Sequence, residues 1–297
     1  MSRSVGVVEA LRELLPAPVA AAFALVTQLG DVWLYAVVLT FLYWYGNRED
    51  TVRIVGVGIG AIGVTLALKQ GFALPRPDVG PPPAPAFLPA VLDPVYAEMT
   101  HADGYGFPSG HAVGSTAIWG AIALWTDVGT RRQRFLVAAT LVGLISLSRL
   151  ALGVHFLVDV VAGVAVGATY LWVTAVATSR AGDGGVIALE IGTALTGTVA
   201  LINGTEDSLA AFGAAAGALV AWYAVDVPLE PWPRTHVGAG YAVATIVALG
   251  AVGLVWTVFP LSGLTIFVVA AFTVGGVIAA PAAVRRAKKR KTRTRTP

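Results

Sequence analysis

The chain has 297 residues, of which 56% are hydrophobic and 12% are charged, and its mean hydropathy is +0.75. Soluble globular proteins carry roughly a quarter charged residues, so this composition excludes an ordinary soluble domain and indicates an integral membrane protein. The absence of cysteine excludes disulfides, iron–sulfur clusters, thiolate zinc sites and a cysteine nucleophile.

The apolar segments are mostly long enough to be helices that cross a bilayer, since a spanning helix needs about 20 residues and barrel strands are shorter and alternating. The N-terminal segment, 1–29, is expected to be interfacial, because Pro16 and Pro18 interrupt it and charged residues replace a signal-peptide core. About nine spans follow in chain order: 30–46, 53–72, 109–126, 134–151, 155–178, 185–202, 207–225, 236–259 and 261–284. The predicted fold class is therefore an all-α, polytopic membrane helical bundle.

Basic residues in the short loops predict the orientation, because Lys and Arg concentrate on the cytoplasmic side. They fall in alternate connections and in the tail: Arg48, Arg53, Arg131, Arg132, Arg134, Arg180, Arg234 and the run from Arg285 to Arg295. The opposite side has the loop 73–108, in which four acidic residues accompany Arg76 alone. We therefore expect a cell-membrane protein with its N-terminus outside and its C-terminus inside.

The polar residues that could form a functional site are distributed unevenly along the chain. Residues 30–180 hold all of them, in a core bundle whose Pro-rich outer loop, 73–108, is expected to be a stiff cap with a short helix near 92–99. Residues 181–284 form an additional four-helix membrane region, for which homodimerisation, a lipid entry path and binding of another component remain alternatives. The basic cytoplasmic tail, 285–297, is expected to bind anionic lipid rather than nucleic acid.

Two of three short polar segments supply permanent cations at the predicted outer face. Lys69 ends the second span and Arg76 follows it, and Arg149 ends a later span. A guanidinium binds phosphate oxygens through a planar fork, although such cations can also snorkel to lipid headgroups as simple interfacial anchors. His155 and Asp159 are four residues apart, so on a helix they share a face and the carboxylate can orient the imidazole for attack.

The remaining segment, Pro108-Ser109-Gly110-His111, predicts the start of a helix. Ser109 is a suitable N-cap, with capping alone as its alternative role, and Gly110 lets the backbone approach a ligand closely. His111 would then lie in the first turn, beside an anion bound at the helix N-terminus. The histidines show no metal-ligand spacing, so no metal and no other cofactor is expected. His101 and His236 are expected to play no part in the site.

These segments resemble the type 2 phosphatidic acid phosphatase superfamily, in its membrane branch. The family pattern is Lys, six residues, Arg-Pro; then Pro-Ser-Gly-His; then Ser-Arg, five residues, His, three residues, Asp. All three parts match here without a gap or substitution. The resemblance covers about residues 20–178. The chain departs from the family by lacking the first core helix and by adding residues 181–284.

The resemblance implies that His155 is a nucleophile that forms a phosphohistidine, that Asp159 orients it, and that His111 is the general acid and then the general base. It also implies a set of phosphate-binding residues: Lys69, Arg76, Ser109, Gly110 and Arg149. The leading hypothesis is a metal-independent membrane phosphatase that hydrolyses a lipid phosphate or polyprenyl diphosphate at the outer face.

Three alternatives use the same residues differently. A phosphotransferase would use the same site with an acceptor other than water. A membrane transporter or binding protein for an anionic headgroup would need polar groups near the midplane of two matching halves, whereas these cluster at one face of one half. A haloperoxidase would hold vanadate in the same anion pocket, but the membrane burial of this chain argues against it.

Overall fold

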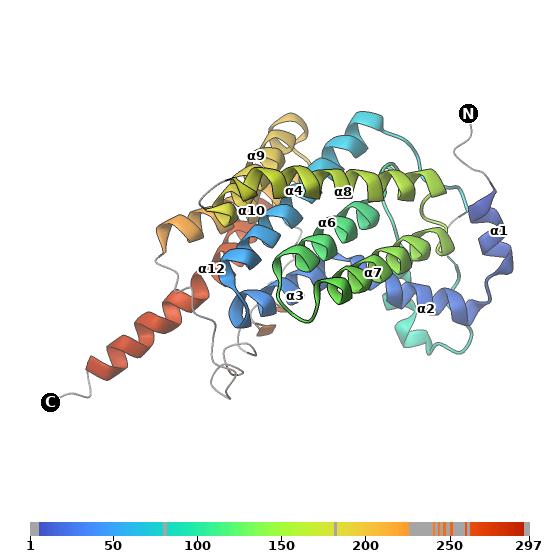
Figure 1. The fold of residues 1–297 in the computed structure, drawn as a ribbon. Helices are drawn as coiled ribbons and strands as arrows, with labels where there is room; N and C mark the ends of the chain where they lie inside the picture. The colour runs from blue at the N-terminus through green and yellow to red at the C-terminus, as the bar shows by residue number, and fades with distance from the viewer. Residues whose placement is uncertain are drawn as a thin grey trace. The chain divides into compact units, whose positions relative to one another are not determined.

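The computed structural model describes residues 6–79, 82–180, 183–225 and 262–293, together with isolated positions between 240 and 259. Regular structure within these ranges is helical (Figure 1). Contacts divide the chain into two compact units. The first unit is Met1–Tyr35 with Val64–Thr174, and the second unit is Ala36–Gly63 with Ala175–Pro297. Every residue predicted to act in the site belongs to the first unit, and the predicted domain division at residue 180 stays a prediction.

The helices follow the predicted apolar segments closely. In chain order they are α1 (Val7–Leu14), α2 (Ala17–Thr27), the 3-10 turn η1 (Gln28–Gly30), α3 (Val32–Tyr45), α4 (Arg48–Phe72), η2 (Ala90–Leu92), α5 (Asp93–Thr100), α6 (Gly110–Trp125), α7 (Arg131–Ala151), α8 (Leu157–Ser179), α9 (Gly184–Asn203), α10 (Glu206–Ala224) and α12 (Leu264–Arg293). Each predicted span coincides with one of them except 236–259, which lies largely outside the described residues.

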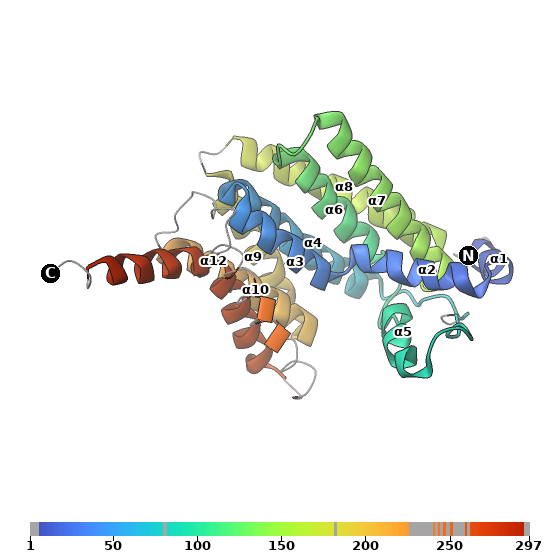
Figure 2. The ribbon, with the colours of Figure 1, turned by 90° about the horizontal axis from the view of Figure 1, so that it is seen from below.

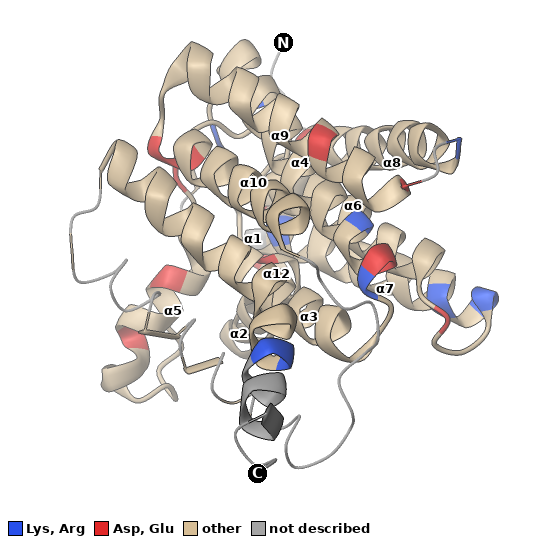
Figure 3. Ribbon diagram, turned by 90° about the vertical axis from the view of Figure 1, so that its left-hand side faces the viewer, with Lys and Arg blue, Asp and Glu red and all other residues tan. Residues whose placement is uncertain are grey.

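The predicted count of about nine spans is not confirmed. Six helices in the described part of the chain are long and apolar enough to cross a membrane, or seven if α2 with η1 and the following α3, bent by 49°, form one broken span. The apolar runs predicted at 30–46 and 109–126 overestimate helix length, because α3 has 14 residues and α6 has 16. A straight helix of that length is shorter than a typical hydrocarbon core. Charged residues are drawn mainly near helix ends and in connections (Figure 3), and the predicted orientation stays a prediction.

Close helix packing in the first unit brings the N-terminal ends of α6 and α8 together. Seen from below, α6, α7 and α8 run side by side (Figure 2). A Cβ atom on Gly163 of α8 would lie 2.8 Å from the Ser109 carbonyl oxygen, and one on Gly167 would lie 2.6 Å from the Val113 carbonyl oxygen. These glycines therefore permit an approach that a larger residue would prevent. The Ser109 N–H consequently donates a hydrogen bond to the Asp159 carbonyl at 2.9 Å.

The described part of the loop 73–108 packs on the first unit, and the short helix expected near 92–99 is confirmed as α5. Tyr96 of α5 packs with Ala24 of α2 and with Leu152 and Val154, which follow α7, in one buried apolar cluster. Figure 2 shows α5 beside α2. The two ends of the loop are also joined, because the Gly106 N–H donates to the Leu74 carbonyl at 2.7 Å.

The second unit is packed through small residues on facing helices. A Cβ atom on Gly217 of α10 would lie 2.1 Å from the Ala271 carbonyl oxygen of α12, so only glycine allows this contact. Its buried apolar cluster includes Tyr43, Trp44 and Leu189. Membrane helices associate in this way when direct backbone contact replaces the hydrophobic driving force that lipid removes.

Candidate active site

Local sequence signals position His155 at the end of α7. Gly153 has φ +73°, and its N–H donates to the Leu150 carbonyl while the Val154 N–H donates to the Arg149 carbonyl. These two bonds form a Schellman motif, in which a left-handed glycine ends the helix and reverses the chain. His155 then follows as a buried loop residue with 1% of its surface exposed. The prediction that His155 and Asp159 share a helix face is wrong in detail, because α8 begins only at Leu157.

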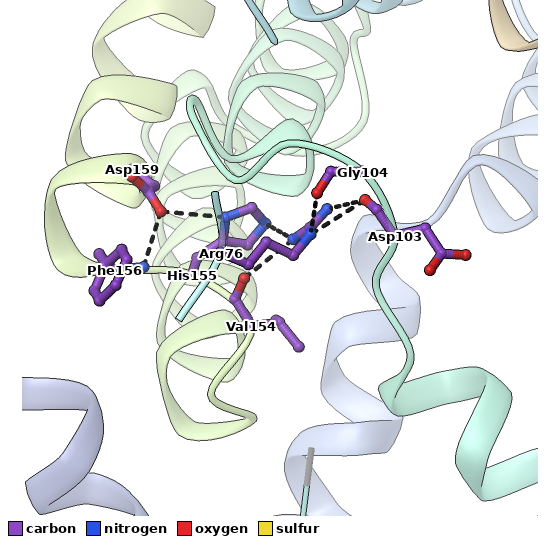
Figure 4. Close-up of polar contacts among 7 residues, drawn as sticks. All are labelled: Arg76, Asp103, Gly104, Val154, His155, Phe156 and Asp159. Carbon is purple, nitrogen blue, oxygen red and sulfur yellow. Dashed lines mark hydrogen bonds and ion pairs between the residues drawn. The ribbon is translucent and has the colours of Figure 1, made fainter. Parts of the chain in front are cut away.

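Asp159 nevertheless reaches His155, because it occupies the third position of α8 and points back toward the helix start. Its Oδ2 accepts a hydrogen bond from the Phe156 N–H at 2.9 Å, and the same oxygen lies 3.6 Å from His155 Nδ1 (Figure 4). This arrangement is half of a capping box. The carboxylate therefore has a fixed direction and no exposed surface.

Arg76 lies on the opposite edge of the same imidazole. Its Nη1 is 3.0 Å from His155 Nε2 and also donates to the Val154 carbonyl (Figure 4). Its other nitrogens donate to the Asp103 and Gly104 carbonyls, so the backbone of the outer loop holds the guanidinium. A guanidinium only donates, so Nε2 is the acceptor and Nδ1 carries the proton that faces Asp159.

The electrostatic environment favours the neutral form of His155. Burial lowers the pKa of His155 well below its ordinary value, and the charges of Arg149, Arg76 and Lys69 lower it further. A backbone hydrogen bond with Gly106 acts in the opposite direction. Burial also lowers the pKa of Arg76, against the attraction of Asp159 and Asp103. The imidazole is thus held neutral near pH 7, as a nitrogen nucleophile requires.

Ser109 and His111 come from the start of α6. Ser109 occupies the N-cap position as predicted, but its side chain makes no capping hydrogen bond. Its Oγ atom is buried and has no hydrogen-bond partner among the described residues. The neighbouring Gly110 packs closely on α4, since a Cβ atom there would lie 3.3 Å from Thr65 Cγ2. His111 Nε2 lies 3.9 Å from Asp31 Oδ2.

Arg149 lies in the last turn of α7 with 3% of its surface exposed. Its Nη1 donates to the hydroxyl of Thr27 at 2.6 Å, and Thr27 is itself fully buried. Sequence reasoning missed Thr27 and Asp31, because both lie beside a short apolar segment interpreted as interfacial. The available signal was an isolated carboxylate, Asp31, between two apolar runs.

The structure thus brings the predicted residues to one place. Lys69, Arg76 and Arg149 are close enough to act electrostatically on both imidazoles. Several buried polar atoms of the cluster have no hydrogen-bond partner among the described residues: Ser109 Oγ, His111 Nε2, Arg149 Nε and His155 Nδ1. Each such atom costs about 1–3 kcal/mol if it stays unsatisfied. Three cations with unsatisfied polar groups make a site suited to a small, multiply charged oxyanion.

A cavity of about 510 Å³ adjoins this cluster on the side of Asp31. It is lined by residues from η1, the start of α3 and α5: Gln28, Asp31, Trp33, Pro94, Val95, Glu98 and Met99. The Trp33 indole N–H donates to the Gln28 side-chain oxygen at 2.9 Å, which orders one wall. The cavity therefore combines apolar surface with the carboxylates of Asp31 and Glu98, and Asp31 is the lining residue that also contacts His111.

Part of the chain is similar to a known protein family and to a bacterial phosphatase. Residues 50–183 match the model of the PAP2 superfamily. Phosphatidylglycerophosphatase B of Bacillus subtilis (strain 168) is 29% identical over 80 residues, which cover 25% of this chain and 39% of that protein. The matched region thus spans well under half the length of this curated relative.

Two solved structures are also similar. One is a transmembrane PAP2 type phosphatidylglycerolphosphate phosphatase from Bacillus subtilis, with 19% identity, a TM-score of 0.48, and coverage of 59% of this chain and 84% of that chain. The other is LpxE of Aquifex aeolicus, with 18% identity, a TM-score of 0.45, and coverage of 58% of this chain and 94% of that chain.

Proposed function

We propose that this chain is a member of the PAP2 superfamily, whose model matches residues 50–183, and that it is an integral membrane phosphatase. In this proposal it hydrolyses a lipid phosphate or a polyprenyl diphosphate at the outer membrane face, without a metal, through a phosphohistidine. The observation that carries the proposal is the buried cluster itself: three cations and several unsatisfied polar atoms surround a neutral histidine held by a carboxylate.

The first step is attack by His155 Nε2 on phosphorus. The N–P bond forms as the bond from phosphorus to the leaving-group oxygen breaks, and His111 gives that oxygen a proton. Arg76 contacts Nε2 at 3.0 Å, so the phosphoryl group takes its place on this nitrogen and the guanidinium turns to a phosphate oxygen. Asp159, 3.6 Å from Nδ1, stabilises the positive charge that develops on the ring.

The second step is hydrolysis of the phosphohistidine. His111, now neutral, takes a proton from a water molecule that attacks phosphorus, and the N–P bond breaks with its electron pair returning to His155 Nε2. Inorganic phosphate leaves and both histidines regain their starting protonation states. The cations stabilise charge on the equatorial oxygens in both steps, which is where most of the catalysis of phosphoryl transfer lies.

The membrane setting supports a lipid as the substrate. Lys69 and Arg149 lie in the last turns of α4 and α7, both of which are long and apolar enough to span a bilayer. A headgroup can reach such cations while its acyl or prenyl chain remains among the helices and lipid. The related phosphatidylglycerophosphatase B of Bacillus subtilis supports a phosphomonoester on a lipid headgroup as the first substrate to test.

The test is phosphate release by purified protein from a panel of lipid phosphates and polyprenyl diphosphates, with His155→Ala beside the wild type. We expect His155→Ala to lose more than about 1,000-fold in activity, because no nucleophile remains. His101→Ala is the matched histidine control, since 58% of the His101 side chain is exposed and its imidazole pairs with the exposed carboxylate of Asp103. A wild type that hydrolyses none of these lipids, or His155→Ala with full activity, would falsify the proposal.

Two further measurements examine the intermediate and the metal. Acid-labile, base-stable labelling of the wild type by a ³²P-labelled lipid substrate, absent in His155→Ala, is expected for a phosphohistidine. A chelator is expected to leave the activity unchanged. Acid-stable labelling would contradict the proposed intermediate, and a strict divalent-metal requirement would contradict the proposed mechanism.

The proposed orientation can be tested directly because the chain has no cysteine of its own. Phe87 of the outer loop and Val128 of the connection between α6 and α7 are 64% and 76% exposed. We expect a membrane-impermeant maleimide to label Phe87→Cys in intact cells and Val128→Cys only after permeabilisation. The reverse pattern would place the site on the cytoplasmic face.

A further inference from the structure

Asp31 is the carboxylate nearest to the second histidine of the cluster. Its Oδ2 lies 3.9 Å from His111 Nε2, and Nε2 has no hydrogen-bond partner among the described residues. Asp31 lies between η1 and α3, at the point where the chain bends by 49°. The carboxylate of Asp159 faces His155, so each of the two histidines has a carboxylate of its own.

The packing around Asp31 favours the close approach of its carboxylate to His111. A Cβ atom on the preceding Gly30 would lie 2.6 Å from Ile145 Cγ2 and 3.1 Å from His111 Cδ2. Glycine at this position therefore lets the turn that carries Asp31 sit directly against the imidazole and against α7. The Asp31 N–H donates to the Gln28 carbonyl and its carbonyl accepts from the Tyr35 N–H, so the backbone on both sides is fixed.

The ordinary role of an aspartate at a helix start does not account for this side chain. An N-cap carboxylate accepts a hydrogen bond from the first turn of its helix. The described contacts of the Asp31 carboxylate include no such bond to α3; the carboxylate contacts His111 and also attracts the guanidinium of Arg149. The side chain is 38% exposed and also lines the cavity beside the cluster, so Asp31 borders both the imidazole and that cavity.

We propose that Asp31 is a positioning residue for His111, and this inference rests on the proposed function. His111 must carry a proton to the leaving-group oxygen while Arg149, Lys69 and Arg76 act on it with like charge. A carboxylate at Nε2 offsets that repulsion and orients the ring, so Nδ1–H faces the leaving group. Closure of the 3.9 Å gap to hydrogen-bond distance accompanies protonation of the imidazole.

The experiment compares two leaving groups in Asp31→Asn and in the wild type. An alkyl lipid phosphate needs proton donation to its leaving oxygen, whereas p-nitrophenyl phosphate has a stable phenolate and needs none. We expect Asp31→Asn to lower kcat for the alkyl lipid phosphate about 10-fold or more, and kcat for p-nitrophenyl phosphate less than about 2-fold. Glu98→Gln, which removes another carboxylate of the same cavity, is the matched control and should change neither rate.

The pH profile supplies a second readout that a merely structural role would not move. The alkaline limb of kcat for the alkyl substrate reports loss of the proton from the general acid, and Asp31→Asn should move this limb to lower pH. The charged groups that act on His111 besides Asp31 are Arg149, Lys69, Arg76 and the imidazole of His155, and all are retained in this variant. Asp31→Glu should recover part of the activity.

Each outcome separates this inference from the proposed function. Equal losses on both leaving groups, or an unmoved alkaline limb, would show that Asp31 acts only through folding and would overturn the inference. An unaffected Asp31→Asn would overturn it as well, with the phosphatase proposal intact. A wild type that releases phosphate from neither substrate would overturn the proposed function itself.

Discussion

The two compact units treat their buried polar groups differently. In the second unit, the Tyr43 hydroxyl donates to the Ile278 carbonyl at 2.9 Å and Arg48 Nε donates to the Tyr43 carbonyl. The first bond joins α3 to the sequence-distant α12, and the second joins α3 to the start of the next helix, α4, so both stabilise packing. In the first unit, Ser109 Oγ and Arg149 Nε are buried without a partner among the described residues. Such groups destabilise a fold unless a ligand completes them, and these two lie beside His155 and other cations, so this cluster is the part of the first unit that is suited to binding an anion.

Among the variants that test this difference between the units, Arg149→Lys in the first unit is expected to have the largest effect. We expect kcat/KM for a lipid phosphate to fall about 100-fold, because an ammonium cannot bind Thr27 and present a planar fork to phosphate at once. Arg131→Lys at the other end of α7 is the control, since Arg131 lies over the Phe135 ring away from the cluster. Comparable losses of kcat/KM in both variants would show that any Arg→Lys substitution in α7 impairs the enzyme, and would contradict a specific role for Arg149.

Gly217→Ala is expected to affect stability rather than chemistry. Its Cβ atom would lie 2.1 Å from a backbone oxygen of α12, and we expect a loss of about 2 kcal/mol, seen as a lower Tm in detergent. Gly276→Ala on α12 is the control, because nothing lies within 4 Å of its Cβ position and alanine favours a helix. The specific activity of correctly folded Gly217→Ala should match the wild type. A selective loss of catalysis would refute the separation of roles between the units.

Ser109→Ala removes a buried hydroxyl, a change that usually lowers stability, but here it should lower activity instead. We expect about a 10-fold loss in kcat/KM and no loss of thermal stability, because the hydroxyl has no protein partner to lose. Ser115→Ala on the same helix is the matched control. The Ser115 hydroxyl donates to the Ala112 carbonyl, so this variant should lose a little stability and keep its activity. A lowered Tm for Ser109→Ala would argue for capping alone.

The smallest expected effect is a shift of the acid limb of the pH profile. Because the folded protein lowers the pKa of His155, kcat/KM should persist as pH falls to the ordinary histidine value of about 6.5 and decline only below it. The unfolded chain binds the proton more readily in that window, so stability should rise with pH from the lowered pKa up to about 6.5. His155→Gln should weaken this dependence of Tm on pH, and an unchanged dependence would contradict the lowered pKa of His155.

Several particular elements were predictable because their signals are local. The pattern of apolar runs located α4, α7 and α8 to within a few residues, and breakers such as Gly153 marked their ends. The three polar segments contain the cations and histidines that the structure brings together in the cluster. The resemblance to the PAP2 superfamily is confirmed over residues 50–183.

Other elements depended on contacts that no local pattern contains. Thr27 and Asp31 gave no motif, because their partners Arg149 and His111 lie far along the chain. The length of α6 was overestimated, because hydropathy alone does not locate a helix end. Ser109 was predicted to be the N-cap of α6 and a phosphate-binding residue. Its N-cap position is confirmed, but its hydroxyl makes no capping hydrogen bond, and the Ser109 N–H donates to the Asp159 carbonyl instead.

The sequence by itself determined the chemistry of this protein: the apolar helices, the three cations and the two histidines follow from residue type and spacing. Only the tertiary structure decided which atoms meet. It showed Arg76 on Nε2 of His155, Asp159 facing Nδ1, and Asp31 beside His111. The physical reason is that residue type sets what a side chain can bind, whereas helix packing through glycines such as Gly30 and Gly163 sets how closely distant segments approach.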